Sequence, residues 1–356
     1  MARAGLGAGW TCLFANDVDE KKARAYRANW GGEVLSVRDI RALSAADLPG
    51  RADLAWGSFP CQDLSLAGAG VGLNGARSGT FHAFWRLVAG LAAEGRAPSL
   101  VVLENVCGAL TSRRGADFAA ICRTFAEHGY GLGPLVMDAA DFTPQSRPRL
   151  FLVGVREGVR IDPELVSESP TMAAHTPALS RAIAAAGLKA IWWTLPAPPK
   201  HNLGLANVIE DDPKAMRWHT SAQTRHILGL MSDLNREKVR AVQARGGRAV
   251  GAVYRRTRTD AAGRRVQRAE VRFDGVAGCL RTPAGGSSRQ TLLIVDGGAV
   301  RSRLMSARET ARLMGLADDY LLPPSATEAY HLTGDGVVVD VVRHLARHLL
   351  EPLLAR

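Results

Sequence analysis

The stretch that decides the fold runs from Leu54 to Gln62 and reads LAWGSFPCQ. Its apolar first half predicts a buried strand, and Pro60 stiffens the turn that follows. Cys61 would therefore stand at the end of a strand, where α/β proteins bind ligands. A glycine-rich segment, Ala67 to Gly75, comes next. A lone cysteine is more often an inert core residue, but this setting favours a nucleophile.

Two further apolar runs are flanked by groups that suit the same chemistry. Leu100 to Leu103 is followed directly by Glu104 and Asn105. The run Leu150 to Val155 is preceded by three polar side chains: Gln145, Arg147 and Arg149. A thiol, a carboxyl and a guanidinium at strand ends predict a site that attacks a ring able to accept a proton.

Composition limits the class of protein. The 356 residues, 47% of them hydrophobic, suffice for one large and one smaller domain, and no apolar run approaches the roughly 20 residues of a membrane span. The first residues lack a signal-peptide pattern. Five scattered cysteines form neither a disulfide framework nor a zinc motif, so we expect a reducing cytoplasm and no metal.

Two other enzyme classes that use a cysteine do not fit the sequence. Leu64 stands where a zinc deaminase needs a second cysteine, and no histidine has a context that favours a papain-like hydrolase.

The net charge of +11, from 45 basic and 34 acidic residues, favours a polyanionic partner. An arginine-rich composition without such a partner is the alternative. Clustering favours the first reading, because Arg255, Arg256 and Arg258 lie close to the run Arg264 to Arg268. Arginine side chains bind phosphates and guanine edges. The alternative interpretation of this cluster is a charged face that contacts only solvent.

The pattern along the chain predicts α/β structure with a largely parallel sheet, followed by an insertion. Residues 1–157 alternate short apolar runs with amphipathic stretches, whereas residues 158–300 are rich in proline and arginine and weakly periodic. Residues 301–356 return to helix and are expected to fold back on the first domain. The predicted strands are 11–15, 54–57, 100–103 and 150–155, and the predicted helices are 20–29, 80–93, 118–128, 306–314 and 337–354. Ser306 and Glu309 form a capping box in the fourth of these helices.

Five ordered motifs resemble those of the DNA cytosine-5 methyltransferase family, over nearly the whole chain. They are Gly57 to Gln62, Glu104 to Val106, Gln145 to Arg149, Arg308 to Gly315 and Gly334 to Val339. A single Pro-Cys-Gln would be weak, but five in order are specific. The resemblance implies a Rossmann-like S-adenosylmethionine-dependent methyltransferase fold with a smaller inserted target-recognition domain.

The implied reaction methylates C5 of cytosine. C5 is a poor nucleophile until a thiolate adds at C6, so Cys61 would form a covalent adduct. Glu104, with its pKa raised by burial, would donate a hydrogen bond or proton at N3. Arg147 would hold O2 and orient Glu104. The remaining catalytic candidates by resemblance are Pro60, Gln62 and Asn105.

A stacked base cannot be attacked at C6, so the enzyme would flip it out of the duplex, and Ser65 to Arg77 would close over it. Arg149 has two alternative roles, one structural and one in DNA binding. Gln145 is expected to order its loop on the DNA side. Arg281 and Arg289, near the replaced Thr-Leu pair at Cys279 and Leu280, are further DNA-binding candidates, together with Arg255, Arg256 and Arg258.

For the methyl donor, Asp17 follows a predicted strand, where an acidic side chain can bind ribose hydroxyls. Val18 would flank the adenine. The remaining cofactor candidates rest mainly on resemblance: Asp39, Ile40, Thr80, Asp335 and Gly336. The Asp335-Gly336 pair replaces the family's usual asparagine and small residue.

The family's opening F-x-G-x-G strand is not found, and Met1 to Ala8 is interpreted as the remnant of the helix that follows it. This leaves two alternatives to an active bacterial DNA methyltransferase of a modification system. One is a catalytically impaired DNA-binding relative, against which Cys61, Glu104 and Arg147 argue. The other is an RNA cytosine-5 methyltransferase, against which the long basic insertion argues. A monomer at the nucleoid, acting on double-stranded DNA beside a possible cognate endonuclease, is expected.

Overall fold

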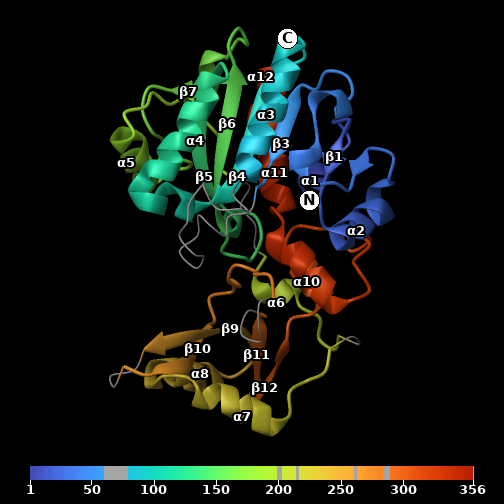
Figure 1. The fold of residues 1–356 in the computed structure, drawn as a ribbon. Helices are drawn as coiled ribbons and strands as arrows, with labels where there is room; N and C mark the ends of the chain where they lie inside the picture. Colours follow the sequence, from blue (N-terminus) through green and yellow to red (C-terminus); the bar gives the residue numbers. More distant parts are fainter. Residues whose placement is uncertain (60–78, 199–202, 214–215, 260–262, 284–288, 356) are drawn as a thin grey trace. The chain divides into compact units, whose positions relative to one another are not determined.

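The fold is seen in a computed structural model, which describes residues 1–59, 79–198, 203–213, 216–259, 263–283 and 289–355 (Figure 1). The chain forms two compact units. The larger unit contains Ala2–Asp138, Pro148–Pro198 and Val341–Arg356, and the smaller unit contains Met1, Ala139–Arg147 and Pro199–Asp340. Apart from Met1 and the short stretch Ala139–Arg147, the chain changes unit after Pro198 and after Asp340, whereas the sequence pattern placed boundaries near residues 158 and 300.

The larger unit is built on a four-stranded sheet in the order β3 (Leu54–Gly57), β4 (Leu100–Val106), β6 (Pro148–Arg156), β5 (Tyr130–Asp138). Strands β3 and β4 are parallel, but β6 runs antiparallel to both β4 and β5. The expectation of a largely parallel sheet is therefore wrong for this four-stranded sheet. The cause is β5, which the sequence pattern did not predict and which returns the chain to β6 without a crossover helix.

Strand β5 was missed because it contains Gly131, Gly133 and Pro134, residues typical of turns. The structure gives a packing reason for Gly133. A Cβ atom there would overlap the indole ring of Trp193, which is fully buried and donates its Nε1–H to the Gly133 carbonyl at 2.9 Å. This glycine therefore makes room for a neighbouring tryptophan rather than for a turn.

Helices α3 (Thr80–Ala93) and α4 (Ala116–Glu127) lie against this sheet (Figure 1). The predicted helix 80–93 is confirmed, and the predicted helix 118–128 begins two residues earlier. Apolar side chains from the helices and strands form one cluster because they repeat at helical and strand spacing. Its buried members include Phe81, Trp85, Phe118, Phe125, Leu150 and Leu152.

The rest of the larger unit surrounds that core. Strands β1 (Ala15–Asn16) and β2 (Leu35–Ser36) form a separate parallel pair, so the strand predicted at 11–15 is shorter and lies later. Helix α2 (Glu20–Trp30) is capped by Asp19, as the predicted helix 20–29 requires. The remaining elements before Pro198 are α1 (Ala2–Leu6), β7 (Val166–Ser167), α5 (Pro177–Ala185) and β8 (Trp192–Trp193).

The C-terminal stretch predicted as helix is helical from residue 339 to 354. It consists of α11 (Val339–Leu345), a π-helical segment (Ala346–Leu350) and α12 (Glu351–Leu354). Within the described ranges, no helix has the length and apolar character needed to cross a membrane.

The smaller unit contains an antiparallel sheet in the order β10 (Arg265–Arg272), β9 (Arg248–Thr259), β11 (Thr291–Asp296), β12 (Ala299–Leu304). Helices α7 (Ser221–Gly229) and α8 (Asp233–Arg245) pack on one face of this sheet through a single apolar cluster. The expectation of a loop-rich insertion is therefore wrong. Several arginines interrupt the apolar positions of β9 and β10, which hid the strand pattern. The described residues of the unit also contain the helices α6 (Leu205–Val208), α9 (Ala307–Leu313) and α10 (Ala326–Asp335).

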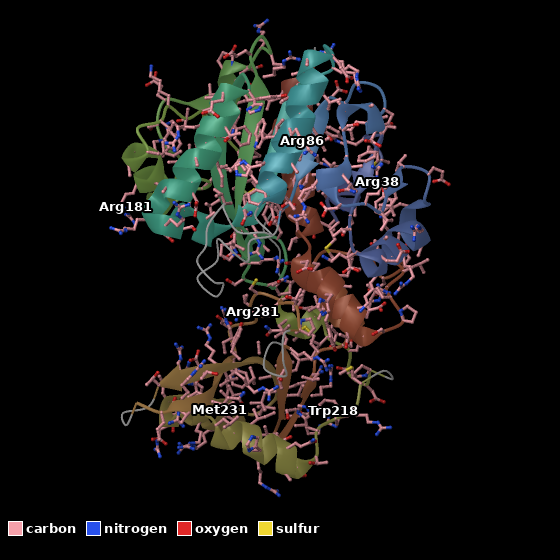
Figure 2. All side chains as sticks on the ribbon, in the orientation of Figure 1. Arg38, Arg86, Arg181, Trp218, Met231 and Arg281 are labelled. Atoms are coloured by element: carbon pink, nitrogen blue, oxygen red, sulfur yellow. The ribbon has the colours of Figure 1, made fainter. Side chains whose placement is uncertain are left out.

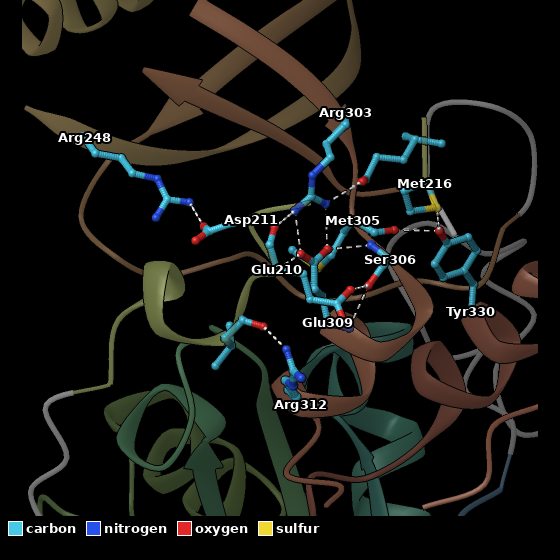
Figure 3. Close-up of polar contacts among 12 residues, drawn as sticks. Glu210, Asp211, Met216, Arg248, Arg303, Met305, Ser306, Glu309, Arg312 and Tyr330 are labelled. Atoms are coloured by element: carbon cyan, nitrogen blue, oxygen red, sulfur yellow. Dashed lines mark hydrogen bonds and ion pairs between the residues drawn. The ribbon is translucent and has the colours of Figure 1, made fainter. Parts of the chain in front are cut away.

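A buried ion pair fastens β12 to α9 (Figure 3). The guanidinium of Arg303 donates to both carboxylate oxygens of Glu309, at 2.6 and 2.8 Å, and both side chains are fully buried. Glu309 also accepts from the backbone N–H of Ser306 and of Glu210. The predicted capping box at Ser306 is confirmed, and the same carboxylate closes it. One glutamate thus joins a helix start, a strand and the chain after α6.

Replacing Arg303 by methionine should therefore destabilise this region by about 3–5 kcal/mol, because Glu309 would be left as an unpaired buried charge. Hydrogen exchange of the β12 and α9 peptides measures the loss. Arg236→Met is the matched control, since its ion pair with Asp233 is on the surface and should change stability by under about 1 kcal/mol. Equal protection factors in the two variants would contradict this account.

Candidate active site

The chain that leads to Cys61 is fastened to β4 and α3. Pro60, Cys61, Gln62 and the segment 65–77 lie outside the described residues, so Phe59 is the last described position before the cysteine. The Asn105 amide donates to the Phe59 carbonyl at 3.3 Å, and the Phe59 ring lies 5.4 Å from that of Phe81. Asn105 is therefore a tether for the segment before the predicted nucleophile, a role that sequence reasoning did not identify.

Parallel pairing brings the two strand ends to the same edge. In the β3–β4 register, Gly57 is opposite Leu103, so β3 ends level with Leu103 while β4 continues through Glu104 to Val106. Gly57 has to be small here, because a Cβ atom would come within 2.9 Å of the Leu103 side chain and also press on Phe84. In this register Glu104 lies next to the end of β3, the strand that precedes Cys61 in the sequence.

Glu104 forms a buried ion pair with Arg149. The residue is 6% exposed, and its Oε1 lies 3.1 Å from the Arg149 Nε. The antiparallel β4–β6 register explains the contact: Val106 is opposite Arg149 and Glu104 is opposite Phe151, so Glu104 and Arg149 are diagonal neighbours on one face. A carboxylate at this depth is stable only with such a partner.

Arg147, which the sequence analysis placed beside Glu104, binds backbone carbonyls of the smaller unit. Its guanidinium donates to the carbonyls of Leu280, Gly334 and Gly336 at 2.7–2.9 Å. A further contact, at 3.3 Å, reaches the Cys279 sulfur. The side chain is almost fully buried. The sequence spacing did not distinguish the two arginines, because residues two apart on an extended chain point the same way.

Gln145 is fully buried in the smaller unit, and its amide bonds to protein atoms. Its Nε2 donates to the Leu313 carbonyl at 2.8 Å, and its Oε1 accepts from the Leu280 N–H at 3.1 Å. These two bonds order the loop around Gln145, and the DNA-binding role of Gln145 stays a prediction. Gln145 and Arg147 together hold residues 139–147 to residues 277–280.

Cys107 is a second thiol close to this edge, and its surroundings make it unreactive. It follows directly after β4, and burial raises its pKa to about 11, although the nearby Arg149 guanidinium opposes the shift. The thiolate form is therefore disfavoured at neutral pH.

We expect iodoacetamide to alkylate Cys107 at pH 8 about 100-fold more slowly than an ordinary thiol, because the pKa exceeds the usual value of about 8.5. The rate should rise about tenfold per pH unit up to the pKa of the thiol, since only the thiolate reacts. Peptide-resolved mass spectrometry gives the rate, and the same peptide in urea-unfolded protein is the control. A folded-state rate equal to the unfolded one would refute the burial argument.

The cofactor candidates of the larger unit gather at the ends of β1 and β2. Asp17 directly follows β1, and its Oδ1 accepts from the Asp19 N–H at 2.9 Å. Val18 is 68% exposed, which is unusual for an aliphatic side chain. Asp39 follows β2, and its hydrogen bonds with the Arg41 side chain and backbone lower its pKa to about 2. Ile40 is half-buried, and so is Thr80, the first residue of α3.

These residues fit the adenosine half of the expected methyl donor. The carboxyl ends of parallel strands present acidic side chains for ribose hydroxyls beside an exposed aliphatic surface suited to adenine. Asp335 and Gly336 lie in the smaller unit at the end of α10. Asp335 is exposed, and the Gly336 carbonyl accepts from Arg147.

The DNA-binding candidates divide between the two faces of the smaller unit's sheet. Val253 points into the cluster beneath α8, so by strand alternation Arg255 lies on that side and is half-buried. Arg256 and Arg258 lie on the opposite face and are exposed. Arg281 is also exposed (Figure 2). Arg289 lies over the Tyr330 ring at 5.6 Å and donates to Thr327.

Glu270, which the sequence analysis did not single out, is an ion-pair partner of both Arg256 and Arg258. A signal was present, because it is the lone acid in the basic run Arg264 to Arg272. No spacing rule, however, gives the strand register that brings these side chains together.

Comparison with known proteins defines the class. A family model described as C-5 cytosine-specific DNA methylase matches residues 2–351. The type II methyltransferase M1.ScrFI of Lactococcus lactis subsp. cremoris is 22% identical over 342 residues, covering 96% of this chain and 72% of that one. M.HpaII of Haemophilus parainfluenzae is 24% identical over 364 residues, covering 97% and 84%. The solved structure of a Spodoptera frugiperda DNMT2 mutant superposes with a TM-score of 0.62 at 15% identity, covering 99% and 95%.

The fold is that of an S-adenosylmethionine-dependent methyltransferase, as the sequence predicted. The chain belongs to the C-5 cytosine-specific DNA methylase family. Its enzyme class is DNA cytosine-5 methyltransferase, and its methyl donor is S-adenosylmethionine.

Proposed function

We propose that the enzyme methylates C5 of a flipped-out cytosine in duplex DNA through a covalent bond between Cys61 and C6. The observation that carries the proposal is the buried Glu104–Arg149 pair, set at the strand edge where Asn105 tethers the chain leading to Cys61. A nucleophile alone would suit many reactions. A carboxyl and a guanidinium held together, as Glu104 and Arg149 are, suit a ring that carries N3 next to a C2 carbonyl.

The proposed reaction differs from the expected one in a single residue role. The Cys61 thiolate adds at C6, and the electron pair moves through the ring to N3, where Glu104 supplies the hydrogen bond or proton. Arg149, the partner of Glu104, binds O2 in place of Arg147, whose guanidinium is held by backbone carbonyls. The enamine that results is nucleophilic at C5 and takes the methyl group. Loss of the C5 proton to water then forms the C5–C6 double bond, breaks the C6–S bond to release the Cys61 thiolate, and any proton on N3 returns to Glu104.

S-adenosylmethionine supplies the electrophilic methyl group when it is bound. We propose that Asp17 and Asp39 bind its ribose, that Val18 and Ile40 flank its adenine, and that Thr80, Asp335 and Gly336 complete the site. Two observations support this assignment: the acidic residues follow two paired parallel strands, and Val18, next to Asp17, is exposed.

The smaller unit would recognise the duplex. Its basic sheet face carries Arg256 and Arg258, and Arg281 is exposed in the same unit. Pro60 and Gln62 would shape the turn around the nucleophile. The type II methyltransferase names of the relatives support a role in bacterial restriction–modification, beside a cognate endonuclease and at the nucleoid. We propose a monomer, since one strand is modified at a time.

The test is incubation of the protein with labelled S-adenosylmethionine and, separately, bacterial duplex DNA or total RNA. Nucleoside analysis should find label in 5-methylcytosine from the DNA alone. Label in RNA alone would replace the proposed substrate. Duplex binding without label in either nucleic acid would favour the impaired DNA-binding relative.

A further inference from the structure

One acidic residue lies within the basic face of the smaller unit's sheet. In the β9–β10 register Arg256 is directly opposite Arg268, and Glu270 is opposite Tyr254. Ala269 and Val271 point into the cluster beneath α8, so Glu270 points to the other face, with Arg256, Arg258 and Arg268. The strand register therefore fixes a carboxylate among three arginines.

Glu270 contacts two of these arginines. Its Oε1 lies 2.7 Å from the Arg258 Nη2, and its Oε2 lies 3.7 Å from the Arg256 Nε. The Arg256 guanidinium also lies 5.9 Å from the centre of the Tyr254 ring. Arginines directly opposite one another, such as Arg256 and Arg268, repel, and a carboxylate close to one of them offsets part of that repulsion. In the free protein Arg256 and Arg258 are therefore already paired with Glu270.

We propose that Glu270 is an internal competitor for DNA phosphate, which limits binding of this face to duplex DNA of any sequence. This role rests on the proposed function, in which duplex DNA is the substrate. A carboxylate and a phosphate oxygen accept from the same guanidinium N–H groups, so the DNA backbone has to displace Glu270 to engage Arg256 and Arg258. Only a site that adds base contacts then binds tightly, so Glu270 is a specificity-determining residue.

The expected effect is modest, because all three side chains are partly exposed, Glu270 by 36%. Exposed ion pairs have small energies, so we expect Glu270→Gln to tighten binding to a duplex lacking the cognate site by about 2- to 10-fold. The dependence of log K on log salt should become steeper by about 1, the value for one more phosphate contact.

The matched control is Glu237→Gln on α8. It removes the same charge and breaks a similar exposed pair, with Arg240 at 3.4 Å, on the helix that covers the other face of the sheet. Fluorescence anisotropy with a labelled duplex at several salt concentrations compares the two variants. Glu237→Gln should change affinity less than twofold, which measures the effect of net charge alone.

A second set of variants tests whether Glu270 acts through Arg256 and Arg258. In an Arg256→Gln/Arg258→Gln background, Glu270→Gln should no longer tighten binding, because its partners are gone. Equal effects of Glu270→Gln and Glu237→Gln, or a gain that persists without the two arginines, would overturn the role of Glu270 while leaving the proposed methyl transfer intact. If no protein, including the wild type, binds duplex DNA, the proposed function itself is overturned, and the role of Glu270 with it.

Discussion

Replacing Cys61 by serine should reduce methyl transfer to DNA by at least about 10⁴-fold, because a serine hydroxyl is not ionised near neutral pH and cannot add to C6. Duplex affinity should change little, because the substitution alters a single atom. Steady-state turnover with saturating labelled S-adenosylmethionine measures the first quantity, and anisotropy with a labelled duplex measures the second.

Cys107→Ser is the matched control for this experiment. The Cys107 thiol follows directly after β4 and undergoes the same one-atom change, but burial keeps it protonated. We expect this variant to retain most of the wild-type turnover. Substantial turnover by Cys61→Ser, or a loss of equal size in Cys107→Ser, would show that Cys61 is not the nucleophile.

Glu104→Gln should lower the turnover number by about 10²- to 10⁴-fold, the usual contribution of a positioned acid or base. Glutamine keeps the shape of the side chain but cannot exchange a proton with N3 at the rate a carboxyl can. The effect should fall on kcat more than on KM, because the interaction with N3 strengthens as electrons reach the ring nitrogen.

The two arginines of the same motif provide a matched comparison. Arg149 is paired with Glu104 in the larger unit, whereas Arg147 binds three carbonyls in the smaller unit. Arg149→Lys should therefore lower kcat at unchanged stability of the smaller unit. Arg147→Lys should mainly loosen residues 139–147, as hydrogen exchange would show. The reverse pattern would restore the role that the sequence motif first suggested for Arg147.

Local signals in the sequence were enough for several elements. The helix at residues 80–93 and the strand at 54–57 were predicted with the bounds that the structure gives, because their apolar spacing is regular and their ends are marked. The capping box of Ser306 and Glu309 needs only two residues three positions apart, so it too could be predicted. The buried partner of Glu309, Arg303, could not be predicted, because an arginine in an alternating strand looks solvent-exposed.

Elements whose cause lies far along the chain were missed. Strand β5 contains glycines and a proline for a reason that involves Trp193, and no local pattern of residues 130–138 shows it. The roles of the site residues also depend on contacts that local sequence does not show. Ordered motifs indicated Glu104, but the choice between Arg147 and Arg149 depends on the register of β4 and β6. The tether from Asn105 to Phe59 likewise requires the strands to be paired.

The most direct test of covalent catalysis is incubation of the protein with S-adenosylmethionine and a duplex carrying 5-fluorocytosine at its target site. Fluorine at C5 blocks the final proton loss, so the enzyme should remain covalently attached to the DNA, and mass spectrometry should locate the bond at Cys61. An adduct that persists in denaturant with the wild type and is absent with Cys61→Ser is the predicted result. Methylation of the unmodified duplex without any adduct on the fluorinated one, or an adduct that Cys61→Ser still forms, would contradict it.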